Sequence, residues 1–230
     1  MFRIARFSAI AVGLLATAAL TSCSKDNSSN PVAPVLQAQV MVVHSSPDAP
    51  AVDLLVDGVV AGTGLAFPNN TAYLGVPAGT RNVKVNVAGT TTTVINANLP
   101  VTGGANYTVF ASDVVASIGA VVLTDDLTAP AAGKAHVRFV HLSPDAPAVD
   151  VAVQGGPVVF ANKAFKQYSA FTPVDAGTYN FEVRLAGTST VALPLNSITL
   201  QAGKIYTVFA KGLLSGSGAQ ALGAQIIANN

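Results

Sequence analysis

The stretch that decides the fold occurs twice: HSSPDAPAVD at residues 44–53 returns as HLSPDAPAVD at residues 141–150. The offset between later matching segments grows from 97 to 99 residues, so the second copy has gained two residues between matching segments. Loops tolerate length changes of this kind. The matching segments therefore indicate that the same domain occurs twice in the chain. The other matching segments are AGT at 78–80 and 176–178, and YTVFA at 107–111 and 206–210.

The two copies divide most of the chain between them. We place the first copy at residues 36–127 and the second at residues 134–230, with TAPAAG at 128–133 as the linker. About 90 residues is an ordinary size for one small domain. Repeats of this length, present only twice, do not form a solenoid.

Hydrophobic residues alternate with polar ones within each copy, as in NVKVNV at 82–87 and NFEVRL at 180–185. A period of two predicts half-buried strands. Gly and Pro follow such segments every 8–12 residues, and no stretch has an apolar helical face. The pattern predicts an all-β chain of two tandem antiparallel Ig-like β-sandwich domains after a signal peptide and a flexible tether. Further strands rich in β-branched residues are predicted at 40–44, 52–56, 107–111, 115–123, 137–141, 149–153, 206–210 and 219–228.

The SPDAPAVD segment is suited to a rigid crossing between two strands. Pro47 and Pro50 each lack a backbone N–H and fix φ, so a strand cannot continue through them. Asp48 has a short carboxylate that accepts hydrogen bonds from backbone N–H groups of a turn. We therefore expect Asp48 and its counterpart to cap this turn.

Paired copies of H-x-S-P-D-A-P-A-V-D-x-x-V-x-G, each followed by A-G-T and then by Y-T-V, resemble the bacterial domain of unknown function 4397. The pattern runs from His44 to Gly58 and again from His141 to Gly155, and the resemblance covers nearly all of the chain after the N-terminal segment. It implies a secreted or envelope β-domain, often in tandem and often on a lipoprotein. It brings no established activity, so no catalytic residues are transferred.

The N-terminus, MFRIARFSAIAVGLLATAALTSC at residues 1–23, has a short positive region with Arg3 and Arg6 and continues as an apolar run. The run has the length of a signal peptide and is short for a membrane span. It ends in Leu20-Thr21-Ser22-Cys23, which resembles the lipobox of bacterial lipoproteins. That resemblance implies cleavage between Ser22 and Cys23 and a lipid on the Cys23 sulfur. The alternatives are an ordinary secretory signal and an uncleaved signal anchor.

We therefore interpret residues 1–22 as a lipoprotein signal peptide and residues 23–35 as the lipidated cysteine and a polar, flexible tether. Several acyl chains anchor a protein stably, whereas a single chain is marginal. Ser24 follows the cysteine where inner-membrane lipoproteins often have Asp. By that resemblance we expect an exported protein that is lipid-anchored to the outer membrane, on its periplasmic or surface face.

In each copy the His, the Ser and the two Asp of the repeated motif are candidates for metal binding or catalysis. Imidazole and carboxylate bind zinc or calcium, but the spacing fits no calcium loop and the prolines restrict convergence. His44, Ser46 and Asp48 have the residue types of a hydrolase triad, although side chains two apart around a proline turn rarely meet. We expect structural roles instead, with a local hydrogen bond between each His and the second Asp. The eight residues are His44, Ser46, Asp48, Asp53, His141, Ser143, Asp145 and Asp150.

The composition excludes several classes of protein. Twelve Lys and Arg against eleven Asp and Glu give a net charge of +1, so the chain has no basic excess for nucleic acid. Half of the residues are hydrophobic, which argues against broad disorder. The single cysteine, Cys23, excludes an intramolecular disulfide and a multi-cysteine zinc cluster. No phosphate-binding loop, Rossmann fingerprint or HExxH pattern is present, so we expect no cofactor and no metal.

These patterns predict a bacterial cell-envelope lipoprotein that is not an enzyme and acts as a structural, scaffold or adhesion module. The alternative is a binding module for envelope polysaccharide or a partner protein, which would use Tyr73, Tyr168 and Phe171 as an exposed aromatic cluster. A hydrolase or metal-dependent enzyme is the third hypothesis. The acidic pair Asp125-Asp126 is expected to be a solvated strand end.

Overall fold

The computed structural model describes residues 35–230, which form one compact unit that we call the folded body. It contains β-strands and two short 3₁₀ turns, and no α-helix occurs in this range. Accordingly, residues 35–230 offer no helix long and apolar enough to cross a bilayer.

We call the half from β1 to β8 repeat 1 and the half from β9 to β16 repeat 2. The elements of repeat 1 are β1 (Gln37–Ser45), β2 (Val52–Val56), β3 (Val59–Leu65), β4 (Leu74–Pro77), β5 (Gly79–Val87), β6 (Thr93–Val101), β7 (Asn106–Ser112), η1 (Val115–Ser117) and β8 (Gly119–Asp125). The elements of repeat 2 are β9 (Lys134–His141), β10 (Val149–Val153), β11 (Val158–Lys163), β12 (Thr172–Asp175), β13 (Gly177–Leu185), β14 (Val191–Leu200), β15 (Ile205–Lys211), η2 (Gly218–Gln220) and β16 (Gly223–Ala228).

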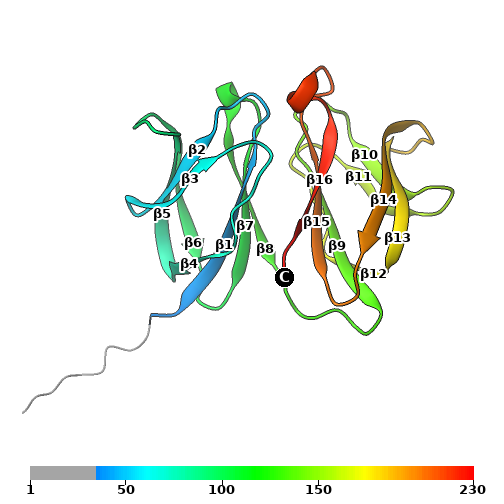
Figure 1. Cartoon of the computed structure of the whole chain (residues 1–230), viewed down its shortest axis with the longest axis horizontal. Helices are drawn as coiled ribbons and strands as arrows, with labels where there is room; N and C mark the ends of the chain where they lie inside the picture. The colour runs from blue at the N-terminus through cyan, green and yellow to red at the C-terminus, as the bar shows by residue number, and fades with distance from the viewer. Residues whose placement is uncertain (1–34) are drawn as a thin grey trace, which may run out of the picture. The chain divides into compact units, whose positions relative to one another are not determined.

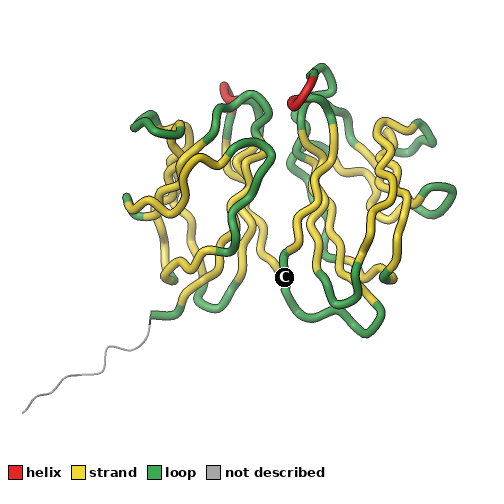
Figure 2. The backbone as a smooth tube through the Cα atoms, viewed as in Figure 1, coloured by secondary structure: helices red, strands yellow, loops and turns green. Residues whose placement is uncertain are grey.

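Each repeat is a sandwich of two four-stranded sheets, so the predicted all-β fold class is confirmed (Figure 1). The strand order is β4-β1-β7-β8 in the inner sheet of repeat 1 and β12-β9-β15-β16 in the inner sheet of repeat 2. The outer sheets have the orders β3-β2-β5-β6 and β11-β10-β13-β14. Inner sheets are those that face the other repeat. Figure 2 shows that the loops gather at the two ends of the strands.

One strand pair in each inner sheet is parallel, β1 with β7 and β9 with β15, whereas the other pairs are antiparallel. The predicted antiparallel arrangement therefore holds for the other strand pairs and not for these two. The SPDAPAVD segment carries the chain out of the inner sheet after β1 and into the outer sheet as β2. Because Pro47 and Pro50 cannot continue a strand, β1 makes no hairpin with β2 and instead pairs with β7.

The last strand of each repeat begins later than the sequence predicts. The segment 115–123 is not one strand, because residues 115–117 form η1 and β8 starts at Gly119. The segment 219–228 likewise contains the end of η2 before β16 starts at Gly223. In repeat 1 the backbone of Asp113 has a left-handed φ of 88°, which turns the chain. The Val115 N–H then donates to Asp48 instead of to a neighbouring strand.

Three hydrophobic clusters form the core. One lies between the two sheets of each repeat, and the third lies between the two inner sheets. In the third cluster the rings of Phe110 and Phe209 pack edge to face, with centroids 5.6 Å apart. The inner sheets are therefore buried on both faces, which explains why β1 and β7 are almost continuously buried. The third cluster consists of Met41, Val43, Phe110, Leu123, Val140, Leu142, Phe209 and Ile227.

Candidate functional site

The two motif histidines lie at the ends of β1 and β9 and are fully buried. Nε2 of His44 is 3.0 Å from the carbonyl oxygen of Pro50, and Nε2 of His141 is 3.0 Å from that of Pro147. Because a carbonyl only accepts, Nε2 carries the proton in both rings. Each imidazole therefore ties the end of an inner strand to the far side of the SPDAP turn.

The first aspartate of the motif holds a loop that is distant in sequence. Asp48 Oδ1 accepts from the Val115 N–H at 2.8 Å. Asp145 accepts from the N–H groups of Leu214 at 2.6 Å and Ser215 at 3.0 Å, and also from the Ser215 hydroxyl at 2.7 Å. These partners lie 67 to 70 residues away, so the aspartates fasten the loop after β7 or β15 and do not merely cap their own turn.

The second aspartate of the motif fastens two further turns of the outer sheet. Asp53 accepts from the Gly64 N–H at 2.8 Å and the Gly89 N–H at 2.9 Å, and these bonds hold the pKa of Asp53 below its ordinary value. The expected hydrogen bond between His44 and Asp53 does not form, because His44 Nε2 donates to the Pro50 carbonyl and its Nδ1 has no partner. Repeat 2 makes the same pair of bonds, from Asn162 N–H at 2.7 Å and Gly187 N–H at 2.8 Å to Asp150.

The remaining motif residues are the serines Ser46 and Ser143. Ser46 and Ser143 are fully buried, and neither hydroxyl oxygen has a hydrogen-bond partner. A hydrolase triad needs a bond between nucleophile and base, but His44 directs Nε2 to a backbone carbonyl. Within residues 35–230, no three His, Cys, Asp or Glu side chains lie close enough together to hold a metal ion. Ser22 and Cys23, the predicted cleavage and lipid-attachment residues, lie outside the described residues.

Acid is expected to destabilise the folded body through the two buried histidines. Burial lowers the pKa of His44 and His141 below the ordinary value of 6.5, so the folded protein keeps both rings neutral where the unfolded chain binds protons. The contribution of the neutral histidines to the free energy of unfolding is therefore fully present above pH 6.5. Below pH 6.5 the free energy of unfolding decreases by up to about 1.4 kcal/mol per pH unit for each ring. Urea unfolding between pH 7.5 and 5.0 measures the slope. A His44→Gln/His141→Gln variant that kept the same slope would contradict this assignment.

The predicted exposed aromatic cluster does not form. Tyr168 is 51% exposed, but Tyr73 and Phe171 are half-buried. The Tyr73 hydroxyl bonds to Asp125 and to Asn229 of repeat 2, and the Phe171 ring contacts Arg138. The expectation of a solvent-facing platform is therefore wrong for Tyr73 and Phe171. Tyr107 is buried, and its hydroxyl accepts from the Thr102 N–H at 3.1 Å.

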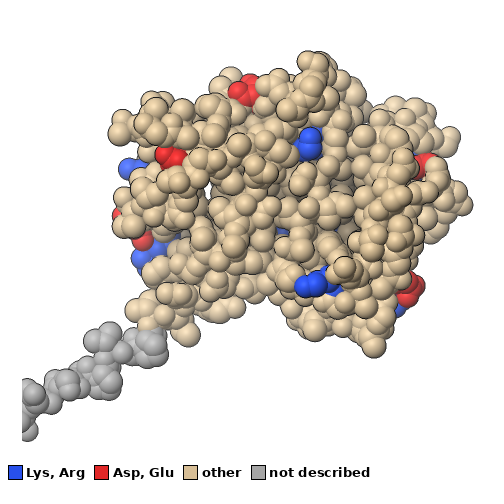
Figure 3. Space-filling model, in the orientation of Figure 1, with Lys and Arg blue, Asp and Glu red and all other residues tan. Residues whose placement is uncertain are grey.

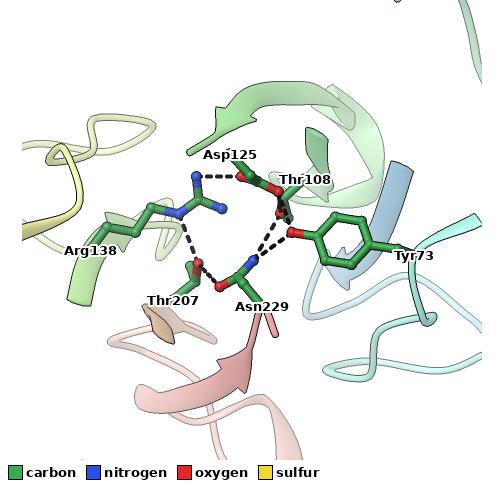
Figure 4. Close-up of polar contacts among 6 residues, drawn as sticks. All are labelled: Tyr73, Thr108, Asp125, Arg138, Thr207 and Asn229. Carbon is green, nitrogen blue, oxygen red and sulfur yellow. Dashed lines mark hydrogen bonds and ion pairs between the residues drawn. The ribbon is translucent and has the colours of Figure 1, made fainter. Parts of the chain in front are cut away.

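A buried polar network joins the repeats, and sequence reasoning did not find it (Figure 4). Arg138 Nη1 lies 2.6 Å from Asp125 Oδ1, and their side chains are 2% and 0% exposed. Asp125 Oδ2 accepts from the hydroxyls of Tyr73 and Thr108, each at 2.6 Å. Burial and the bond to Asp125 raise the pKa of Tyr73, so the phenol stays protonated and remains a donor. Asp125 is therefore not the solvated strand end that the sequence suggests.

The network closes through repeat 2. Arg138 Nε donates to Thr207 Oγ1 at 2.8 Å, and the Thr207 hydroxyl donates to Asn229 Oδ1 at 2.7 Å. Asn229 Nδ2 then donates to the Tyr73 hydroxyl at 3.0 Å. The Arg138 guanidinium also lies 4.5 Å from the centre of the Phe171 ring, a cation–π contact. Asp125, Thr207 and Phe171 thus stabilise the buried charge, while Arg138 Nη2 has no hydrogen-bond partner.

The network uses positions that match between the repeats but hold different residues. Thr108 pairs with Met41 between β7 and β1, whereas Thr207 pairs with Arg138 between β15 and β9. Met41 and Arg138 therefore occupy equivalent places. The other matching pairs are Asp125 with Asn229 and Tyr73 with Phe171.

This difference favours the pairing of repeat 1 with repeat 2. Two copies of repeat 1 would bury Asp125 opposite Met41, and two copies of repeat 2 would bury Arg138 opposite Asn229. Each arrangement leaves a buried charge without its counterion, which is strongly destabilising. The sequence signal was Arg138 itself, an arginine inside the apolar strand KAHVRFVH at 134–141.

The fold and the site define a protein of two β-sandwich repeats whose motif side chains fasten its own backbone. The family model described as Domain of unknown function (DUF4397) matches residues 38–152 and again residues 144–230. The chain belongs to this family, as the repeated motif predicts. A search of curated proteins finds none that matches the chain.

Proposed function

We propose that this protein is a bacterial cell-envelope lipoprotein that acts as a non-enzymatic structural, scaffold or adhesion module. The observation that carries the proposal is the use of the motif side chains in both repeats. His44, Asp48 and Asp53 bond to backbone groups of the turn, the β7–β8 loop and the outer-sheet turns. Their counterparts in repeat 2 do the same. Side chains committed in this way stabilise a shape and are not free to react with a substrate.

The contact between the repeats supports a structural role as a spacer. Besides the buried network, Lys166 of repeat 2 forms an ion pair with Asp113 of repeat 1 at 2.8 Å. Lys211 of repeat 2 lies 5.3 Å from the centre of the Phe67 ring of repeat 1. A spacer needs domains that do not hinge freely, and these contacts oppose hinging. On the face drawn in Figure 3, charged side chains are few and of both signs, which offers no broad basic patch to a nucleic acid.

The anchor in this proposal is a lipid on Cys23. The signal-like segment before Cys23 supports export, and Ser24 favours the outer membrane by resemblance to other lipoproteins. The polar segment from Ser24 to Pro31 would then separate the lipid from the folded body. Membrane contact in this account comes from the lipid and requires no spanning element.

Replacing Cys23 by alanine is expected to abolish lipid attachment and release the protein from membranes. The thioether needs the cysteine sulfur, and without acyl chains nothing of comparable affinity holds the body to a bilayer. Metabolic labelling with radioactive palmitate, followed by membrane fractionation, measures both effects. Ser29→Ala, a matched change in the same polar segment, is the control and should leave labelling intact. Palmitate label and membrane retention in the Cys23→Ala protein would overturn the anchor.

A further inference from the structure

Repeat 1 contains a cavity of about 70 Å³ between its two sheets. Its walls are aliphatic side chains of both sheets, including Val42 and Val109 from the inner sheet and Val83 and Ile95 from the outer sheet. The corresponding space between the sheets of repeat 2 is about 20 Å³. Repeat 2 has its larger space, about 210 Å³, elsewhere, next to His141, Pro147 and Leu214. The two repeats therefore share a fold but differ in where its interior is unfilled.

The difference follows from smaller side chains in repeat 1. Val83 pairs with Ala97 across β5 and β6, where Phe181 pairs with Leu195 in repeat 2. Two positions differ in the opposite sense, Leu54 against Val151 and Leu74 against Thr172. Protein interiors are normally close-packed, and unfilled space lowers stability. The positions with smaller residues in repeat 1 are Val42 against Phe139, Gly62 against Phe160, Val83 against Phe181, Ala97 against Leu195 and Val122 against Ile226.

The cavity reaches the surface at one edge of the sandwich. β6 and β8 are the last strands of their sheets and lie in contact with each other. Three residues that line the cavity on these strands, Asn98, Ala120 and Val122, are exposed. Val122 is 40% exposed although it is apolar. This edge therefore gives a ligand a way in without unfolding the sandwich.

We propose that this cavity binds the end of an aliphatic chain. Its walls carry no charged group, so a charged or strongly hydrated ligand would lose its hydrogen bonds to water on entry. An apolar cavity of about 150 Å³ holds benzene, and the smaller cavity of repeat 1 holds the last few carbons of a chain. The rest of the chain leaves between β6 and β8, and a polar head remains in water beside Asn98. The chain belongs either to a membrane lipid or to a free alkyl compound.

Chain length is the first test, with straight-chain alcohols from butanol to octanol titrated calorimetrically into the folded body. Each buried methylene contributes about 0.8 kcal/mol, which tightens binding about fourfold per carbon. We expect this gain over the first carbons and then a plateau, because the cavity is full. Equal affinity for all lengths, or no binding at any length, would overturn the proposal.

A variant that fills the cavity of repeat 1 can be designed from the residues at the matching positions of repeat 2. Val83→Phe/Ala97→Leu installs the side chains of Phe181 and Leu195 at the matching positions and should weaken octanol binding at least tenfold. Val59→Phe is the matched control, since it makes the same chemical change on β3 at a side chain that is 71% exposed. Circular dichroism confirms folding of each variant. Undiminished binding to the filled variant would contradict the site.

A measurement on the unaltered body keeps the proposal testable if the filled variant fails to fold. Octanol should shift the methyl NMR signals of Val85, Ile95 and Val109, which line the cavity of repeat 1. Shifts confined to repeat 2, whose own apolar space lies next to His141 and Leu214, would overturn the assignment. Sedimentation with phosphatidylethanolamine–phosphatidylglycerol vesicles distinguishes the two sources. Sedimentation that Val83→Phe/Ala97→Leu abolishes assigns a membrane lipid, whereas octanol binding without sedimentation assigns a free alkyl compound.

Discussion

Replacing Asp125 by asparagine is expected to lower the free energy of unfolding of the folded body by about 3–5 kcal/mol. Asparagine keeps the shape of the side chain but removes the negative charge that lies 2.6 Å from Arg138. The guanidinium then remains buried without a counterion, and an uncompensated buried charge is among the most destabilising changes known in proteins. Equilibrium urea unfolding followed by circular dichroism measures the loss.

The companion variant separates the charge from the rest of the network. Asp125→Asn/Arg138→Met removes both charges and places at 138 the residue that repeat 1 has at Met41. Because neither charge is left buried without a counterion, and the amide oxygen of the asparagine at position 125 can still accept from Tyr73 and Thr108, the double variant should recover most of the lost stability. A double variant as unstable as Asp125→Asn alone would show that the ion pair is not the cause.

Much of the fold follows from local pattern in the sequence. The alternation at 82–87 and 180–185 marks strands that the structure contains as parts of β5 and β13. β8 starts at Gly119 and not at residue 115 as the apolar pattern predicts, because the Val115 N–H donates to the distant Asp48. The parallel pairing of β1 with β7 likewise depends on which sheet the chain enters after the prolines, and periodicity carries no such information.

The candidate site was predictable in its residues but not in its contacts. The repeated His and Asp residues stand out in the sequence, but the hydrogen bond expected between each His and the second Asp does not form, and Asp48 and Asp145 bind distant loops. Their partners, however, are up to 70 residues away, beyond the reach of spacing arguments. Asp125 shows the limit most clearly, since an acidic residue at a strand end is normally solvated. Only the packing of repeat 2 against repeat 1 removes it from water.

Replacing Phe209 by alanine is expected to lower the free energy of unfolding by about 3–5 kcal/mol. Phe209 is fully buried, and its ring meets Phe110 of repeat 1 across the boundary between the inner sheets. The substitution therefore leaves a cavity in the cluster shared by both repeats. Tyr168→Ala removes an aromatic ring of repeat 2 that is 51% exposed and should change stability by about 0.5 kcal/mol or less.

Because the repeats share a hydrophobic cluster and a buried polar network, we expect them to unfold as one cooperative body. Amide hydrogen exchange in the Phe209→Ala protein tests this most directly. The substitution lies in repeat 2, so the informative amides are those of β1 and β7 in repeat 1. If the repeats unfold together, these amides lose as much protection as those of β15, about a hundredfold to several thousandfold. Protection that falls in β15 but is unchanged in β1 and β7 would contradict the claim.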